Sequence, residues 1–148
     1  MSEPGPLVGV VLVGHGRTAS ELLAAARGIM GADALAGAIE VDAGVGQTPK
    51  LNAQLCEVLE RADTGAGVLM LVDLWGASPC TCAQTNAGDH RLVTLSGLNL
   101  AMLLKLAALD RRAQGPQALA DLCADSGRRS VQVKIHLPPG DPSQETGT

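Results

Sequence analysis

The chain has 148 residues, of which 46% are hydrophobic, and a formal net charge of −4. This composition fits one domain with a substantial core and excludes a disordered chain. A negative charge with a single tryptophan and no other aromatic residue argues against nucleic-acid binding. No apolar stretch reaches the ~20 residues of a membrane span, and residues 1–6 do not resemble a signal peptide. We therefore expect a cytoplasmic protein without nucleic-acid partners or direct membrane insertion.

The four cysteines are the only residues that suggest a metal or a disulfide from composition. None of them forms a CxxC pair, and the residues are Cys56, Cys80, Cys82 and Cys123. Without a second ligand pair, a metal site on Cys80-Thr81-Cys82 is not favoured. We expect most of the cysteines to be buried free thiols, and we expect no metal and no cofactor.

The first predicted element is a short apolar run over residues 7–13, rich in β-branched side chains and without alternation. Such a run is typical of a strand buried on both faces in a parallel sheet. His15 follows it directly, between Gly14 and Gly16. Open α/β sheets bind ligands at the carboxyl ends of their strands, and glycines let another molecule approach the backbone. His15 is therefore the first candidate functional residue.

Helix and strand signals then alternate along the chain. Thr18 and Glu21 form a capping-box pattern at the start of one helix, which Gly31 ends. Thr48, followed by a proline, and Asn99 are predicted N-caps of two later helices. The pattern predicts strands over 35–41, 67–72 and 91–95, and helices over 20–30, 49–62, 78–87, 100–109 and 116–125.

These elements predict an α/β fold with a doubly wound, mainly parallel four-stranded sheet flanked by helices, within one domain over residues 1–137. Segment 129–137 differs, because its apolar residues alternate with polar ones: Val131, Val133, Ile135 and Leu137. Alternation predicts a half-buried edge strand, antiparallel or paired with another chain. Residues 138–148, rich in proline and polar side chains, predict a flexible tail.

Asp73 is expected to lie beside His15. It follows the third strand, and strands 1 and 3 of a doubly wound sheet are commonly neighbours. Its carboxylate can then accept a hydrogen bond from one ring nitrogen of His15 and leave the other nitrogen as a nucleophile. Taken alone, Asp73 fits a turn or a cap equally well.

Ser78 and Pro79 form a second feature near this site. Serine at the N-cap and proline at the first position begin a helix whose free N–H groups can bind an anion. Trp75 lies between Asp73 and this helix, where it fits either a core position or a docking surface. A nucleophilic histidine, an orienting carboxylate and an anion site together suit phosphoryl transfer, although Ser-Pro alone is more often an ordinary helix start.

Three segments carry a resemblance to a known family: Val13-Gly14-His15-Gly16, residues 71–79 with Asp-x-Trp-Gly-x-Ser-Pro, and residues 97–103. On these segments the chain resembles the IIA domain of the mannose-family sugar phosphotransferase system. The resemblance implies that His15 accepts phosphate from the histidine phosphocarrier protein and passes it to a IIB component that phosphorylates sugar. It also implies that Asp73 orients His15, and that Ser78, Gly16 and Trp75 surround the phosphate.

The resemblance further implies a homodimer, since the family exchanges a C-terminal strand between subunits, and segment 129–137 fits that strand. Four positions depart from the usual family pattern, namely Gly14, Ala77, Cys80 and Ala101. These departures leave the chemistry in place. No IIB domain lies within these residues, so the expected role is either sugar uptake with a separate IIB component or regulation.

Two alternatives remain open at this point. Small cobalt and siroheme chelatases also begin with a strand followed by Val-Gly-His-Gly, where the histidine holds a metal ion. A second histidine would be needed there, and only His90 and His136 are available. The chelatase interpretation leaves residues 73–79 unexplained. The other alternative is a non-catalytic binding module, which keeps the fold and leaves His15 inert.

Overall fold

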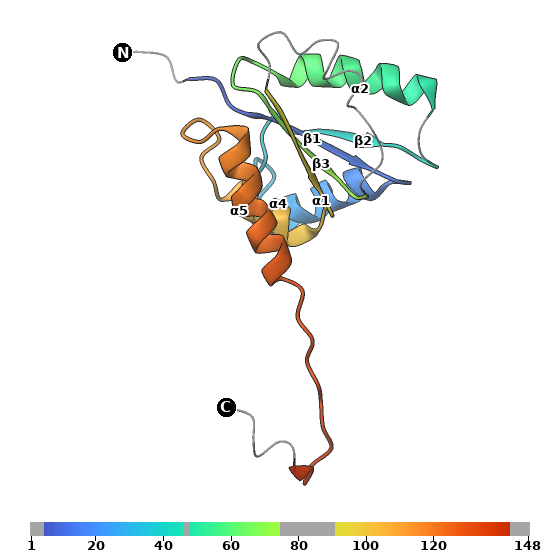
Figure 1. Ribbon diagram of the computed structural model, residues 1–148, viewed down its shortest axis with the longest axis vertical. Coiled ribbons are helices and arrows are strands. Elements are labelled where there is room, and N and C mark those ends of the chain that lie inside the picture. The colour runs from blue at the N-terminus through green and yellow to red at the C-terminus, as the bar shows by residue number, and fades with distance from the viewer. Residues whose placement is uncertain (1–4, 46–47, 75–90, 143–148) are drawn as a thin grey trace.

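The computed structural model describes residues 5–45, 48–74 and 91–142, which contain a four-stranded parallel sheet with helices on both faces (Figure 1). The sheet order is β2-β1-β3-β4, so the first and third strands are neighbours. The strands are β1 (Gly9–Gly14), β2 (Ile39–Asp42), β3 (Val68–Val72) and β4 (Leu92–Ser96). The predicted α/β fold with a parallel sheet is confirmed.

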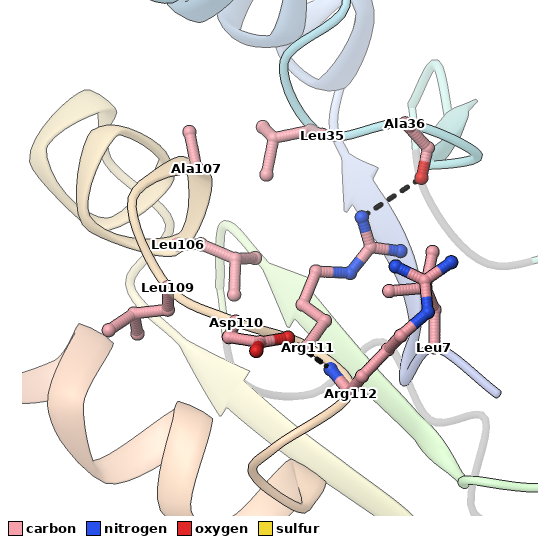
Figure 2. Close-up of a pocket in the computed structure, with 9 residues that line it drawn as sticks. All are labelled: Leu7, Leu35, Ala36, Leu106, Ala107, Leu109, Asp110, Arg111 and Arg112. Atoms are coloured by element: carbon pink, nitrogen blue, oxygen red, sulfur yellow. Dashed lines mark hydrogen bonds between the residues drawn. The ribbon is translucent and has the colours of Figure 1, made fainter. Parts of the chain in front are cut away.

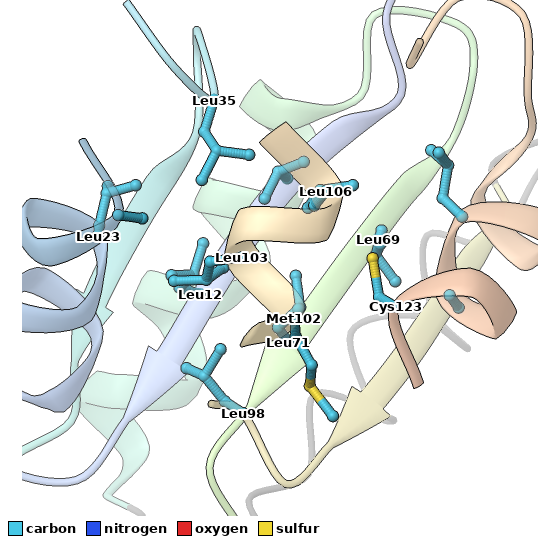
Figure 3. Packing of buried hydrophobic residues seen from close by; sticks show 14 of the residues in the cluster. Leu12, Leu23, Leu35, Leu69, Leu71, Leu98, Met102, Leu103, Leu106 and Cys123 are labelled. Carbon is cyan, nitrogen blue, oxygen red and sulfur yellow. The ribbon is translucent and has the colours of Figure 1, made fainter. Parts of the chain in front are cut away.

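The described helices divide between the two faces of the sheet. On one face lie α1 (Thr18–Met30), α4 (Leu100–Ala107) and α5 (Pro116–Arg129), and α2 (Pro49–Ala62) lies on the other (Figure 1). Successive side chains of a strand point to opposite faces. In β1, accordingly, Leu12 packs in the core under α1 and α4 (Figure 3). Val11 and Val13 pack on the opposite face, under α2.

Both central strands are buried along their whole length, as their unbroken apolar runs predict. Two of the predicted helix caps are also confirmed. Thr48 Oγ1 accepts a hydrogen bond from Leu51 N at 3.1 Å, and Asn99 Oδ1 accepts one from Met102 N at 3.1 Å. The helix predicted over 78–87 lies outside the described residues.

The capping box predicted for the first helix is wrong. Helix α1 begins at Thr18, two residues earlier than predicted, and its N-cap residue Arg17 makes no side-chain capping bond. A carboxylate from another element replaces it, because Asp42 at the end of β2 accepts a hydrogen bond from Ser20 N at 3.0 Å. Local sequence therefore identified the helix but not its cap.

The strand predicted over 35–41 is shorter in the structure. Leu35 has φ of 55° and lies in a turn, so β2 begins only at Ile39. A leucine in the left-handed region is uncommon. Its side chain is 4% exposed and packs in the core under α1 and α4, which explains the apolar signal at this position.

The segment after α5 is where the chain departs most from the prediction. Helix α5 continues to Arg129, and residues 131–138 form no strand with the sheet of their own chain. They extend away from the folded body (Figure 1). The side chains of Val131, Val133 and Ile135 are 78%, 89% and 78% exposed. The predicted half-buried strand is therefore not formed within one copy of the chain.

The two cysteines in the described residues are in different states. Cys123 is a buried free thiol, as predicted, and burial raises its pKa to about 11. Cys56 on α2 is disulfide-bonded and is therefore an exception to the expectation that most of the cysteines are free thiols, while Cys80 and Cys82 lie outside the described residues. No helix in the described ranges is long and apolar enough to cross a bilayer.

Candidate active site

His15 lies at the carboxyl end of the sheet, directly after β1, and its side chain is 44% exposed. The loop that carries it is attached to the end of β2 by two backbone hydrogen bonds. Ala43 N donates to Gly14 O at 2.8 Å, and Gly16 N donates to Gly44 O at 2.7 Å. Gly16 has φ of 56°, which favours glycine. The imidazole is thus accessible but carried on a fixed backbone.

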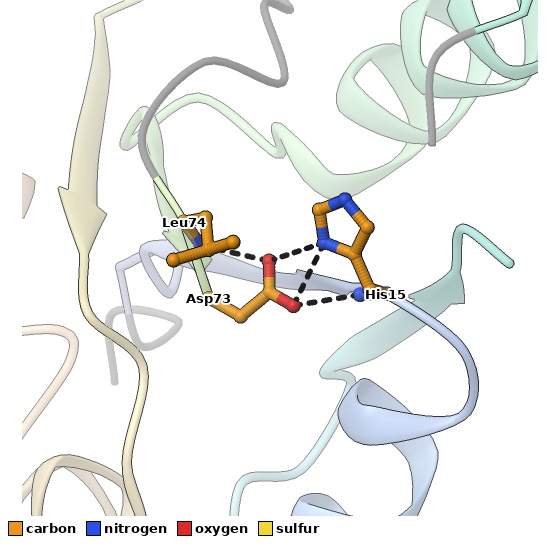
Figure 4. A network of polar contacts seen from close by, with 3 residues as sticks. All are labelled: His15, Asp73 and Leu74. Carbon is orange, nitrogen blue, oxygen red and sulfur yellow. Dashed lines mark hydrogen bonds and ion pairs between the residues drawn. The ribbon is translucent and has the colours of Figure 1, made fainter. Parts of the chain in front are cut away.

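Asp73 reaches His15 from the neighbouring strand, β3. Its own N–H donates to Val13 O at 3.2 Å, which continues the pairing of β3 with β1 beyond the last residue of the strand. The His15 ring Nδ1 lies 3.0 Å from Oδ2 and 3.2 Å from Oδ1 of Asp73 (Figure 4). The predicted contact between the two residues is confirmed.

The Asp73 carboxylate receives two further N–H groups that sequence reasoning did not find. His15 N donates to Oδ2 at 2.7 Å, and Leu74 N donates to Oδ1 at 2.8 Å (Figure 4). His15 therefore contacts this carboxylate through both its backbone and its ring. These contacts fix the carboxylate relative to the loop and to the imidazole at once.

Electrostatics keep Asp73 ionised. Burial raises the pKa of its carboxyl, but other effects that lower the pKa outweigh burial. These are the hydrogen bonds from His15 N, the His15 ring and Leu74 N, and the His15 charge. The pKa of Asp73 consequently lies below its ordinary value. An ionised carboxylate only accepts hydrogen bonds, so Nδ1 carries the proton in this pair. The lone pair of neutral His15 is then on Nε2, which points away from Asp73 in Figure 4.

The start of α1, the helix next to His15, is already occupied by an anion. Asp42 Oδ1 accepts from Ser20 N at 3.0 Å, and Asp42 Oδ2 accepts from the Ser20 hydroxyl. The Ser20 hydroxyl bond is the largest cause of a lowered pKa of Asp42; burial opposes it, and backbone N–H groups and the Arg17 charge reinforce it. This helix start therefore does not offer its N–H groups to an external anion. Asp42 was missed from the sequence, although it follows a strand just as Asp73 does.

The predicted site residues have different outcomes. His15 and Asp73 are brought together, and the exposed Gly16 follows His15 in the same loop. Trp75, Ser78 and His90 lie outside the described residues. His136 is exposed on the segment that leaves the body (Figure 1). Among the described residues, no group of three or more histidine, cysteine, aspartate or glutamate side chains could hold a metal ion.

Comparisons with known proteins show the family to which the chain belongs. A family model described as EIIA-man, PTS system fructose IIA component, matches residues 9–122. The mannose-specific EIIAB component of Escherichia coli K12 is 32% identical over 132 residues, covering 85% of this chain and 39% of that protein. The chain thus spans less than half the length of the curated relatives that it matches first.

Solved structures give the same result. The mannose/sorbose-specific IIA subunit from Enterococcus faecalis has a TM-score of 0.69 at 30% identity, covering 90% of this chain and 98% of that one. An EIIA component from Streptococcus agalactiae, at 21% identity, shares the fold with a TM-score of 0.69, covering 86% of this chain and 97% of that one. The chain belongs to the mannose-type IIA components of the phosphotransferase system.

Proposed function

We propose that this protein is a phosphohistidine carrier, and that Nε2 of His15 accepts and donates the phosphoryl group. The observation that carries the proposal is the double contact of Asp73 with the backbone and the ring of an accessible histidine. Family membership supports phosphoryl transfer over the chelatase and inert-module alternatives.

The proposed step exchanges one P–N bond for another. The Nε2 lone pair of His15 attacks the phosphorus of a phosphohistidine on the donor protein. The donor's P–N bond breaks, and its electron pair stays on the donor nitrogen. The proton on Nδ1 of His15 remains hydrogen-bonded to Asp73, whose negative charge stabilises the positive charge that develops on the ring. The reverse sequence at an acceptor regenerates neutral His15.

The proposed donor is the histidine phosphocarrier protein, and the proposed acceptor is a IIB component. The E. coli relative is named as an EIIAB component, and the match covers 39% of it. We propose that a IIB component receives the phosphoryl group, for sugar uptake and phosphorylation or for regulation. Gly16, Trp75 and Ser78 are the proposed surroundings of the phosphate, and the proposed location is cytoplasmic.

We also propose that the protein acts as a homodimer with exchanged C-terminal segments, within a domain that ends near residue 137 and is followed by a flexible tail. In one copy, every second residue of this segment is an apolar side chain that is largely exposed, namely Val131, Val133 and Ile135. Among the described strands, β4 lies at the edge of the sheet, and none of them pairs with its outer side. An open strand edge readily pairs with a strand of another chain. Pairing there would cover both the edge and these apolar side chains.

Phosphate transfer tests the proposed function directly. Incubation with phosphoenolpyruvate, enzyme I and the phosphocarrier from the same source should add one acid-labile phosphate, detected as a mass increase. His15→Ala should abolish the increase, whereas His90→Ala and His136→Ala, the matched controls, should retain it. Labelling that persists in His15→Ala, or no labelling of the unaltered protein, would overturn the proposal.

A further inference from the structure

A cavity of about 200 Å³ lies at the amino edge of the sheet, opposite the edge that carries His15. Its walls come from the segment before β1, the turn before β2, and the end of α4 with the connection to α5 (Figure 2). Leu35, Leu106 and Leu109 supply apolar surface. Arg111 and Arg112 supply two guanidinium groups. The cavity thus combines an apolar wall with concentrated positive charge.

Arg111 is an unusual member of this wall because it is only 8% exposed. Its Nε donates to Val8 O at 3.0 Å. Its Nη1 donates to Ala36 O at 2.9 Å, the bond drawn in Figure 2. Within the described ranges, Nη2 makes no hydrogen bond and the guanidinium forms no ion pair with a carboxylate. A buried charge is costly unless it is paired, and carbonyl dipoles neutralise it only in part.

Arg112 adds a second positive charge beside the first. Its Nε donates to Gly5 O at 3.0 Å, and its guanidinium also lacks a carboxylate partner in the part of the chain that the structure describes. Asp110, the acidic residue of the wall, accepts a hydrogen bond from Arg112 N at 2.9 Å and forms no ion pair with either arginine. Burial, and then the Arg112 charge, lower the pKa of Arg111. An anion is the group that this environment lacks.

We propose that this cavity binds a small organic anion, in which a carboxylate or phosphate contacts the two arginines and a short aliphatic part contacts the leucines. Guanidinium groups match the oxygens of both anions through paired N–H donors. The volume suits a small acid, since a water molecule occupies about 30 Å³ of liquid. The site is separate from His15, so a bound anion leaves the imidazole accessible to a protein donor.

Titration with defined probes tests the proposal. The probes are butyrate, inorganic phosphate and glycerol 3-phosphate, added at constant ionic strength and followed by NMR of the arginine Nε–H signals. Saturable shifts of Arg111 and Arg112 are expected with at least one probe. Comparing butyrate with glycerol 3-phosphate distinguishes a carboxylate head from a phosphate head. If inorganic phosphate binds as tightly as glycerol 3-phosphate, the leucines contribute nothing, which would overturn the proposed apolar contact.

Variants separate binding from folding. Arg111→Gln removes bonds to two backbone carbonyls, so it can unfold the protein. Arg112→Gln is the informative change, because that side chain is exposed, and it should weaken binding at least tenfold. Arg128→Gln, an exposed arginine on α5 without an ion pair in the described ranges, is the matched control and should bind normally.

Two results would overturn the proposal. The first is the absence of any saturable shift at either arginine, which would leave Arg111 as a purely structural residue. The second is equal weakening in the Arg112→Gln and Arg128→Gln proteins, which would indicate nonspecific charge attraction.

Discussion

Two N–H groups of one residue converge on the Asp73 carboxylate, the backbone N–H and the ring N–H of His15. A ring bond alone would fix the tautomer but leave the imidazole able to tilt with its loop. The backbone bond at 2.7 Å fixes the loop relative to the same carboxylate. The direction of Nε2 is therefore set by a single side chain, which makes Asp73 a positioning residue for the proposed transfer.

Asp73→Asn should slow phosphorylation of His15 while leaving the fold intact. Asparagine keeps the size of the side chain but lacks the charge, and its NH₂ group competes with the ring N–H. The expected loss in rate lies between about tenfold and the ~10⁴-fold loss seen for the orienting carboxylate of serine proteases. Rapid-quench phosphorylation measures it, with Asp33→Asn, an exposed aspartate, as the control. Equal rates in the two variants would show that Asp73 is only a turn residue.

The same carboxylate predicts a dependence of stability on pH. Because the pKa of Asp73 is lower in the folded chain than its ordinary value of 3.8, its contribution is complete above that value. It is lost as the pH falls through the lower, folded-state pKa. Denaturant unfolding from pH 7 to pH 3 should therefore show Asp73→Asn less stable at pH 7 and the difference shrinking below about pH 4. A difference that grows with acid would contradict the assigned direction.

The contact between His15 and Asp73 could be predicted from sequence, because each residue follows a buried apolar run. Parallel strands place such positions at one edge of the sheet. The backbone bond from His15 to Asp73 could not be predicted, since it depends on the path of the loop after Gly14. The role of Asp42 also depends on tertiary structure, because its partner Ser20 lies on α1, an element earlier in the chain.

At the scale of elements, Asp42 joins β2 to the start of α1. Asp42→Ala should lower the free energy of unfolding by about 1 kcal/mol, the usual effect of losing an N-cap acceptor. Denaturant unfolding at pH 7 measures it. Glu40→Ala, an exposed carboxylate on the same strand without a hydrogen-bond partner in the described ranges, is the control. An equal loss in both variants would exclude a capping role for Asp42.

Elements whose signals are local were predicted well, and those that depend on distant contacts were not. Thr48 and Asn99 cap their own helices through the next turn, so the sequence identified both. The pattern Thr18-x-x-Glu21 is equally local, but Asp42 bonds to Ser20 instead. Leu35 carries an apolar signal that is the same for a strand and for a buried turn, so the start of β2 was misplaced.

At the scale of the whole molecule, the segment after α5 is the part whose apolar side chains stay exposed in one copy of the chain. Alternation in 131–137 predicts a strand, but these residues form no strand in the part of the chain that the structure describes. Burying Val131, Val133 and Ile135 against a second copy would contribute up to ~1.5–3 kcal/mol for each side chain. The sequence alone predicts the pattern, and the proposed partner strand belongs to a second copy of the chain.

Val133→Lys combined with Ile135→Lys should convert the proposed dimer to monomers, because the charges oppose burial at the interface. Val45→Lys, at an apolar side chain that is 100% exposed elsewhere on the chain, should leave the assembly unchanged. Sedimentation velocity at micromolar concentration measures the assembly, and circular dichroism confirms the fold. A wild-type protein that is monomeric, or a double variant that stays dimeric, would contradict strand exchange.

The central claim concerns one atom, Nε2 of His15, and one spectrum tests it most directly. The protein is labelled with ¹⁵N at histidine, phosphorylated by the phosphocarrier, and examined for coupling between phosphorus and ring nitrogen. We predict coupling to Nε2 of His15 only, with Nδ1 still carrying the proton that is bonded to Asp73. Coupling to Nδ1, or to a nitrogen of His90 or His136, would contradict the account.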